Sequence, residues 1–171
     1  YPETQGFNFS FGGSFWGAPA TFYFPYRGFL WDKEQLRYIP GIDAGDPRQG
    51  EHLTDRLTDE ALEFIGKASS DPFFLYMSYY TVHTPIEGKR EIADRYRQKI
   101  REGMQQTNAH YAAMHETLDD NVGRLLKKLE DEGIADHTVV ILTSDNGGFI
   151  NEYDGQTVGS HKPLRSGKGG L

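Results

Sequence analysis

The stretch Thr138-Val139-Val140-Ile141-Leu142-Thr143-Ser144-Asp145-Asn146-Gly147-Gly148 decides the fold of this chain. Its first five residues favour β-structure, and an unbroken run of this kind is typical of a strand covered on both faces in a parallel sheet. The strand preference stops at Ser144, and the next four residues have the chemistry of a turn. Asp145 and Asn146 therefore follow the carboxyl end of a predicted strand, where open α/β sheets bind their ligands. The alternative is a plain turn in which both side chains bond only their own backbone.

A second strand and three helices are predicted around this stretch. Residues 73–80 are largely apolar and aromatic and indicate another buried strand, which ends just before His83. A helix is expected to begin at Thr54 or Asp55, with Thr54 or Thr58 as its cap, and to end at residues 69–72. Residues 91–101 have helical potential with a solvated, charged face.

The longest predicted helix has apolar residues at intervals of three and four over about six turns. Gly133 is expected to close it in the left-handed conformation, followed by an apolar contact from Ile134. The residues of the apolar stripe are Tyr111, Met114, Leu118, Val122, Leu125 and Leu129.

Strand, helix and strand in this order predict a crossover between two parallel strands. His83 and the pair Asp145-Asn146 should then emerge on the same side of the sheet. The expected fold class is α/β, a parallel or mixed sheet with flanking helices. Residues 51–148 form its helix-strand-helix-strand core, residues 1–50 are aromatic loops that either wall a pocket or cover the core, and residues 149–171 form a basic, glycine-rich loop.

Composition narrows the class of protein. The chain has 171 residues, of which 37% are hydrophobic and 25% charged, as expected for one soluble globular domain. A net charge of −7 argues against nucleic acid as a partner. No apolar run reaches the roughly 18 residues of a membrane span. The lack of cysteine excludes disulfides and thiolate chemistry within this chain. Neither end resembles a natural terminus, so we expect a piece of a longer protein.

The polar residues at the predicted sheet edge suit the hydrolysis of an anionic ester. Asp145 and Asn146 offer hard oxygen ligands for Ca²⁺ or Mg²⁺, although two ligands are too few for a closed site. His83 and Lys168 would supply hydrogen bonds and positive charge to a sulfate or phosphate ester near that metal. Alternatively, His83 is a structural residue and Lys168 is simply solvated. The loop is no nucleotide-binding P-loop, because Gly169 follows Lys168 where Ser or Thr should stand.

Several motifs, in this order and at these separations, resemble the type I sulfatases. These are formylglycine-dependent, arylsulfatase-like enzymes of the alkaline phosphatase superfamily, and the similarity covers nearly the whole chain. The matching segments are Pro2-Glu3-Thr4-Gln5-Gly6-Phe7-Asn8, Leu53-Thr54-Asp55, Pro72-Phe73-Phe74-Leu75-Tyr76, His83-Thr84-Pro85, Ser144-Asp145-Asn146-Gly147 and Pro163-Leu164-Arg165-Ser166-Gly167-Lys168-Gly169.

The resemblance implies the middle part of a sulfatase catalytic domain and a role for each candidate residue. Asp145 and Asn146 are expected to bind Ca²⁺, with Mg²⁺ possible. His83 would contact the sulfate ester and assist the leaving oxygen, and Lys168 would bridge the sulfate and the nucleophile. His161 and Arg165 would shape the pocket or reach the sulfate or the sugar. The resemblance also implies a periplasmic or secreted protein acting on a small-molecule or carbohydrate sulfate ester.

The chain departs from the family pattern at the nucleophile and at the calcium site. It contains no Cys/Ser-x-Pro/Ala-Ser-Arg motif, from which the formylglycine nucleophile is made, and it lacks the Asp-Asp pair that lies beside that motif in the family and completes the calcium site. Both are expected upstream, in the missing remainder of the domain, so the 171 residues alone should be inactive. Two alternatives stay open: a phosphodiesterase or phosphonate hydrolase of the same superfamily, and a non-catalytic module that binds a cation.

Overall fold

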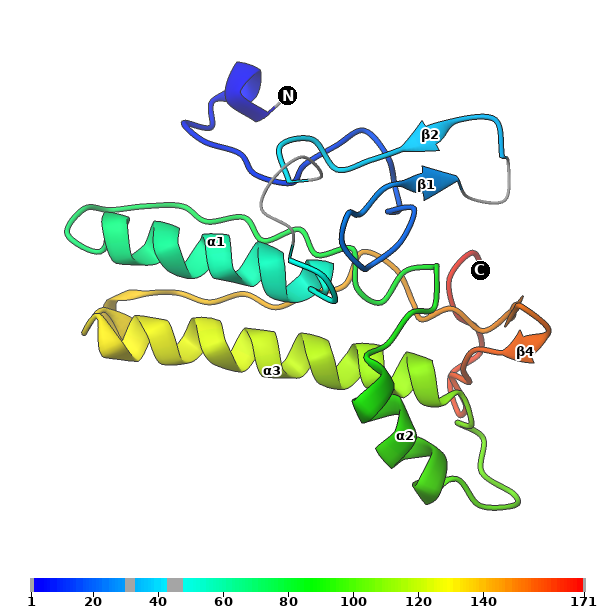
Figure 1. Cartoon of the computed structure of the whole chain (residues 1–171). Coiled ribbons are helices and arrows are strands. Elements are labelled where there is room, and N and C mark those ends of the chain that lie inside the picture. The colour runs from blue at the N-terminus through cyan, green and yellow to red at the C-terminus, as the bar shows by residue number, and fades with distance from the viewer. Residues whose placement is uncertain (1, 30–32, 43–47, 171) are drawn as a thin grey trace.

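The computed structural model describes residues 2–29, 33–42 and 48–170 (Figure 1). The parts of the predicted loop regions at Tyr1, 30–32, 43–47 and Leu171 lie outside the described residues. Three α-helices dominate the described chain: α1 (Leu53–Ala68), α2 (Arg90–Lys99) and α3 (Ala109–Asp131). The shorter elements are the 3₁₀ turns η1 (Pro2–Gln5) and η2 (Ala135–His137) and the strands β1 (Gly28–Phe29), β2 (Leu36–Arg37), β3 (Glu152–Tyr153) and β4 (Gln156–Thr157).

Helix α1 confirms the predicted helix but has a different cap. The cap residue is His52, whose Nδ1 accepts a hydrogen bond from the Thr54 N–H at 3.3 Å. Thr54 and Thr58 therefore lie inside the helix, and both are almost fully buried. The prediction of a threonine cap was wrong because a neutral imidazole nitrogen can accept the same hydrogen bond as a hydroxyl.

Helix α3 confirms the predicted long helix and its closure at Gly133, while its cap at Asn108 was not predicted. The side chain of Asn108 caps its start, accepting from the Tyr111 N–H at 2.9 Å. Gly133, with φ of 71°, closes it. The Ile134 N–H reaches the Leu129 carbonyl at 3.0 Å and the Gly133 N–H reaches the Glu130 carbonyl at 2.9 Å, which is the Schellman arrangement.

Helices α1 and α3 pack side by side and run in the same direction (Figure 1). Asn121 Nδ2 of α3 donates to Asp55 Oδ1 of α1 at 2.8 Å, and one turn further along, Arg124 pairs with Asp59. Helix α2 packs against the first part of α3, around a small cluster of buried residues: Ile92, Ala93, Ala109 and Ala113.

Two long segments return along these helices. Residues 69–81 run back along α1, since Phe73 contacts Phe64 near its end and Tyr79 contacts Thr58 near its start. Residues 134–148 run back along α3, from the contact of Ile134 with Leu129 to the contact of Gly148 with Tyr111. Because α1 and α3 are parallel, the two return segments also point the same way, as Figure 1 shows.

The two return segments are not strands in this structure, contrary to the prediction. Among the described residues, no strand is assigned to 73–80 or 138–144, and the sheets are two antiparallel hairpins, β1–β2 and β3–β4. The run 138–144 was expected to be covered on both faces, yet Val139 is 87% and Ile141 83% exposed. The physical reason is that a parallel strand needs neighbours on its edges and a layer over each face. The described residues supply no neighbouring strand, and the helices half-bury only one face of residues 73–79.

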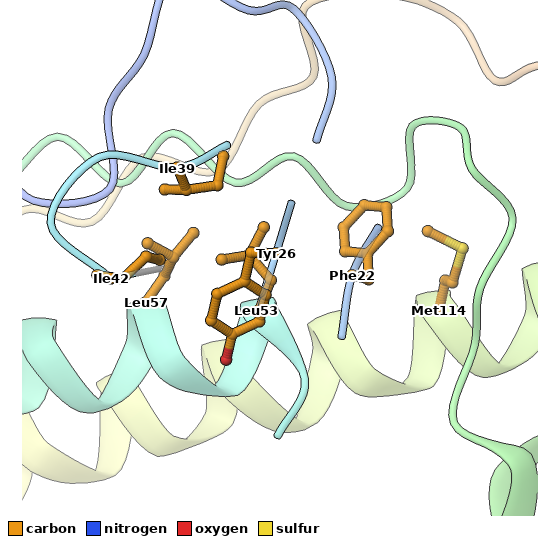
Figure 2. Close-up of a cluster of buried hydrophobic side chains, with 7 residues drawn as sticks. All are labelled: Phe22, Tyr26, Ile39, Ile42, Leu53, Leu57 and Met114. Atoms are coloured by element: carbon orange, nitrogen blue, oxygen red, sulfur yellow. The ribbon is translucent and has the colours of Figure 1, made fainter. Parts of the chain in front are cut away.

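The core lies where the aromatic residues of the first 42 positions pack onto α1 and α3. Figure 2 shows this cluster, which consists of Phe22, Tyr26, Ile39, Ile42, Leu53, Leu57 and Met114. All seven side chains are buried. The first segment therefore covers the helices, which is one of the two roles expected of it. Within the described part of the chain, no helix is long and apolar enough to cross a membrane.

Candidate functional site

The tip at residues 145–148 and the loop at residues 161–168 are joined by two hydrogen bonds. The Lys168 N–H donates to the Gly148 carbonyl at 2.9 Å. The Gly148 N–H donates to His161 Nε2 at 2.8 Å, so this nitrogen carries no proton and the tautomer of His161 is fixed. The structure thus brings the tip with Asp145 and Asn146 against the loop with His161 and Lys168.

Glycine permits the close approach of these loops. A Cβ atom at Gly167 would lie 2.3 Å from the Gly148 carbonyl oxygen and 2.8 Å from Ile150 Cγ2. A Cβ atom at Gly148 would lie 2.4 Å from His161 Nε2. These three distances are too short for any larger residue, so the two glycines set how near Lys168 comes to the tip.

Tyr111 of α3 and Gln106, which precedes this helix, contact the two loops. The Tyr111 hydroxyl lies 3.1 Å from the position that a Gly148 Cβ would take, and burial raises the pKa of this tyrosine, so it stays a neutral phenol. The side chain of Gln106 forms two hydrogen bonds with the backbone of Ser160. Its Oε1 accepts from the Ser160 N–H at 3.1 Å, and its Nε2 donates to the Ser160 carbonyl. The sequence analysis predicted neither role. It assigned Tyr111 to the apolar stripe of the long helix and gave Gln106 no role.

The side chains at the tip and on the loop are exposed and free to bind. Asp145, Asn146, Arg165 and Lys168 all face solvent. No hydrogen bond or ion pair joins the side chain of any of the four to another residue within the described ranges.

His83 lies at the same end of the helical layer but on another loop. The backbone N–H of His83 donates to the Tyr80 carbonyl at 2.8 Å, and this hydrogen bond closes a turn directly after the return segment. Its Nδ1 lies 3.0 Å from the Thr84 carbonyl and 3.1 Å from the buried Thr84 hydroxyl. Nε2 is left for a ligand. Within the part of the chain that the structure describes, no hydrogen bond or ion pair joins His83 to Asp145 or Lys168.

The donor set at the tip fits part of a hard cation's coordination sphere. Asp145 offers carboxylate oxygens and Asn146 an amide oxygen, the ligand types preferred by Ca²⁺ and Mg²⁺. The described residues contain no group of three or more His, Cys, Asp or Glu side chains placed to hold a metal ion. The chain can therefore supply two ligands, and the rest would have to come from elsewhere.

Fold and site together define a partial α/β domain that exposes oxygen ligands beside a basic loop. Comparison with known proteins places this domain in a family. The family model for sulfatases matches residues 2–170, and the chain belongs to the sulfatase family.

Curated relatives and solved structures agree with this assignment. The chain is 40% identical over 141 residues to a sulfatase of Formosa agariphila, covering 76% of this chain and 24% of that protein. It is 34% identical to human arylsulfatase H over 125 residues, covering 72% of this chain and 20% of the relative. A crystal structure of Ps i-CgsB in complex with k-i-k-neocarrahexaose matches with a TM-score of 0.58 and 31% identity, over 78% of this chain and 27% of that one. The chain thus spans about a quarter of the length of the relatives it matches.

Proposed function

We propose that the protein containing this chain hydrolyses organic sulfate esters, with sulfated carbohydrates as its substrate class. Membership of the sulfatase family supports the reaction. The carbohydrate is favoured by the k-i-k-neocarrahexaose named in the complex of a similar structure. The resemblance to the family also favours a periplasmic or secreted location. The observation that carries the proposal is the contact between the tip 145–148 and the loop 161–168, in which the Lys168 N–H and the His161 ring bond Gly148, two residues after Asn146.

Each candidate residue has a role in this proposal. Asp145 and Asn146 would hold Ca²⁺ or Mg²⁺, and the bound cation would offset the negative charge of the sulfate. Lys168 would bind a sulfate oxygen through its ammonium group. His83 would hold the proton that passes from Nε2 to the leaving alcohol oxygen, while Thr84 orients the ring through Nδ1. His161 and Arg165 would shape the pocket. The nucleophile, a formylglycine in the resembling family, would come from outside these residues.

Lysine 168 offers the sharpest test of this function. In the full-length protein, Lys168→Ala should lower kcat/KM for an aryl sulfate by roughly 10²-fold or more, because a preorganised positive charge at the sulfate is lost. Calcium affinity, measured by calorimetry, should change little because Lys168 is no metal ligand. Lys162→Ala is the matched control, since it removes an exposed lysine from the same loop.

The same assays separate the alternatives. No measurable turnover of either ester by the unmodified full-length protein, together with intact calcium binding, would indicate a cation-binding module without catalysis. Unchanged turnover in Lys168→Ala would overturn the proposed role of Lys168. Faster hydrolysis of a phosphate diester than of the aryl sulfate by the unmodified protein would indicate a phosphodiesterase or phosphonate hydrolase.

A further inference from the structure

Two buried hydroxyl pairs join the start of α1 to the return segment that leads to His83. The Thr54 hydroxyl is hydrogen-bonded to the Thr81 hydroxyl. One helical turn later, the Thr58 hydroxyl is hydrogen-bonded to the Tyr79 hydroxyl at 2.6 Å. Thr54 is 1% and Thr58 0% exposed, so both pairs are shielded from water on the helix side.

The spacing of these pairs fixes the register of the segment on the helix. Thr54 and Thr58 are four residues apart and share one face of α1, while Tyr79 and Thr81 are two residues apart and share one face of an extended segment. A shift of the segment by one residue would turn the opposite face to the helix and break both hydrogen bonds. Apolar contacts alone would resist such a shift less, because they are not directional.

The far side of the His83 loop is also attached to the start of α1. His52 Nδ1 accepts from the Thr54 N–H, so Nε2 carries the proton and donates to the Glu87 carbonyl at 3.2 Å. Lys89 Nζ pairs with Asp55 Oδ2 at 2.6 Å.

His83 therefore sits in a loop that is held at residue 81 on one side and at residues 87 and 89 on the other. The loop is attached to three residues, His52, Thr54 and Asp55, which lie within positions 52–55 at the cap and start of α1. The first turn of α1 is consequently a rigid base for the loop.

We propose that Thr54 is a positioning residue that sets the place of the His83 imidazole through its hydrogen bond to Thr81. This inference rests on the proposed role of His83 in protonating the leaving oxygen. Displacement of a reacting group by about 1 Å can cost up to roughly 10²-fold in rate. Loss of the Thr54–Thr81 bond should thus reduce catalysis without removing any group that touches the substrate.

The test compares Thr54→Val with Thr54→Ser in the full-length protein. Valine keeps the shape and removes the hydroxyl, whereas serine keeps the hydroxyl. Thr54→Val should lower kcat about 10-fold or more on phenyl sulfate, and much less on nitrophenyl sulfate, whose leaving group needs little proton assistance. KM should stay within about twofold for both substrates, and Thr54→Ser should restore most of kcat. A merely structural defect would lower kcat equally on the two substrates.

A double-mutant cycle with His83→Ala decides whether Thr54 acts through His83. If it does, Thr54→Val should cause no further loss of kcat in the His83→Ala background. Independent, multiplying losses would overturn the inference while leaving the role of His83 intact. Unchanged rates in His83→Ala itself would overturn both the inference about Thr54 and the proposed role of His83. Should Thr54→Val fail to fold, Thr81→Val and Thr81→Ser test the same bond from the half-buried side.

Discussion

At the scale of single residues, His52 shows how one buried imidazole can serve two partners. Burial lowers the pKa of His52, against the opposing hydrogen bond to the Glu87 carbonyl and the charge of Asp55. Only the neutral imidazole can form both hydrogen bonds, because Nδ1 accepts from the Thr54 N–H while Nε2 donates to the Glu87 carbonyl. Protonation would turn the accepting nitrogen into a donor facing another donor.

This predicts an acid-sensitive contribution of His52 to stability. The folded-state pKa lies below the ordinary value of 6.5, so the unfolded chain binds more protons as the pH falls. The contribution is complete above pH 6.5 and declines below it, with a slope approaching about 1.4 kcal/mol per pH unit. Thermal unfolding of the protein and of His52→Asn between pH 7.5 and 5 measures this. Asparagine keeps a cap acceptor without the titration, so its curve should be flatter.

His115 provides the internal comparison for that experiment, since burial lowers its pKa as well and it remains in both proteins. Equal pH dependence of the two melting temperatures would show that His52 contributes nothing in this range.

The site at this scale was only partly predictable from sequence. Asp145, Asn146 and Lys168 stand out because their residue types and neighbours carry a chemical meaning. The residues that support the site do not, since Tyr111 and Gln106 act through contacts with Gly148 and Ser160, which lie 37 and 54 positions away in the chain. Such contacts follow from the tertiary fold and leave no local pattern.

At the scale of elements, local signals predicted helices well and strands poorly. Helix α3 is specified within its own sequence by an apolar period, a cap at Asn108 and a left-handed Gly133. A strand depends on partners elsewhere, so the apolar run 138–144 could predict extended backbone but not its neighbours. The short hairpin β3–β4 was missed because its residues look like a polar loop.

The cap of α3 can be tested alone. Asn108→Ala should lower the free energy of unfolding by about 1 kcal/mol, because the Tyr111 N–H loses its acceptor at 2.9 Å. Asn108→Ser keeps an oxygen acceptor and should cost little. Chemical denaturation of the three proteins gives both values. An equal loss in the two variants would mean that Asn108 acts through packing rather than through the cap.

At the scale of the whole molecule, the two return segments have apolar faces that no described residue covers. Along residues 73–79, alternate side chains are half-buried against the helices, while Phe74 and Tyr76 on the other face are 74% and 70% exposed. Residues 139–142 are exposed throughout. Because the two segments run in the same direction and expose apolar faces of this size, we expect further polypeptide to cover or pair with them.

Hydrogen exchange can show whether further polypeptide pairs with these segments. In the 171-residue chain, the described structure gives the amides of residues 139–144 no backbone acceptor, so they should exchange near the unprotected rate. In the full-length protein, pairing into a sheet should slow them by about 10³-fold or more, which corresponds to local opening energies above roughly 4 kcal/mol. The amides in the middle of α3 serve as the control, because their hydrogen bonds lie within the helix and should protect them in both proteins. If residues 139–144 exchange equally fast in the full-length protein while α3 is protected, the segment is not a sheet strand. Asp145 and Asn146 would then lack the rigid support that a metal site requires.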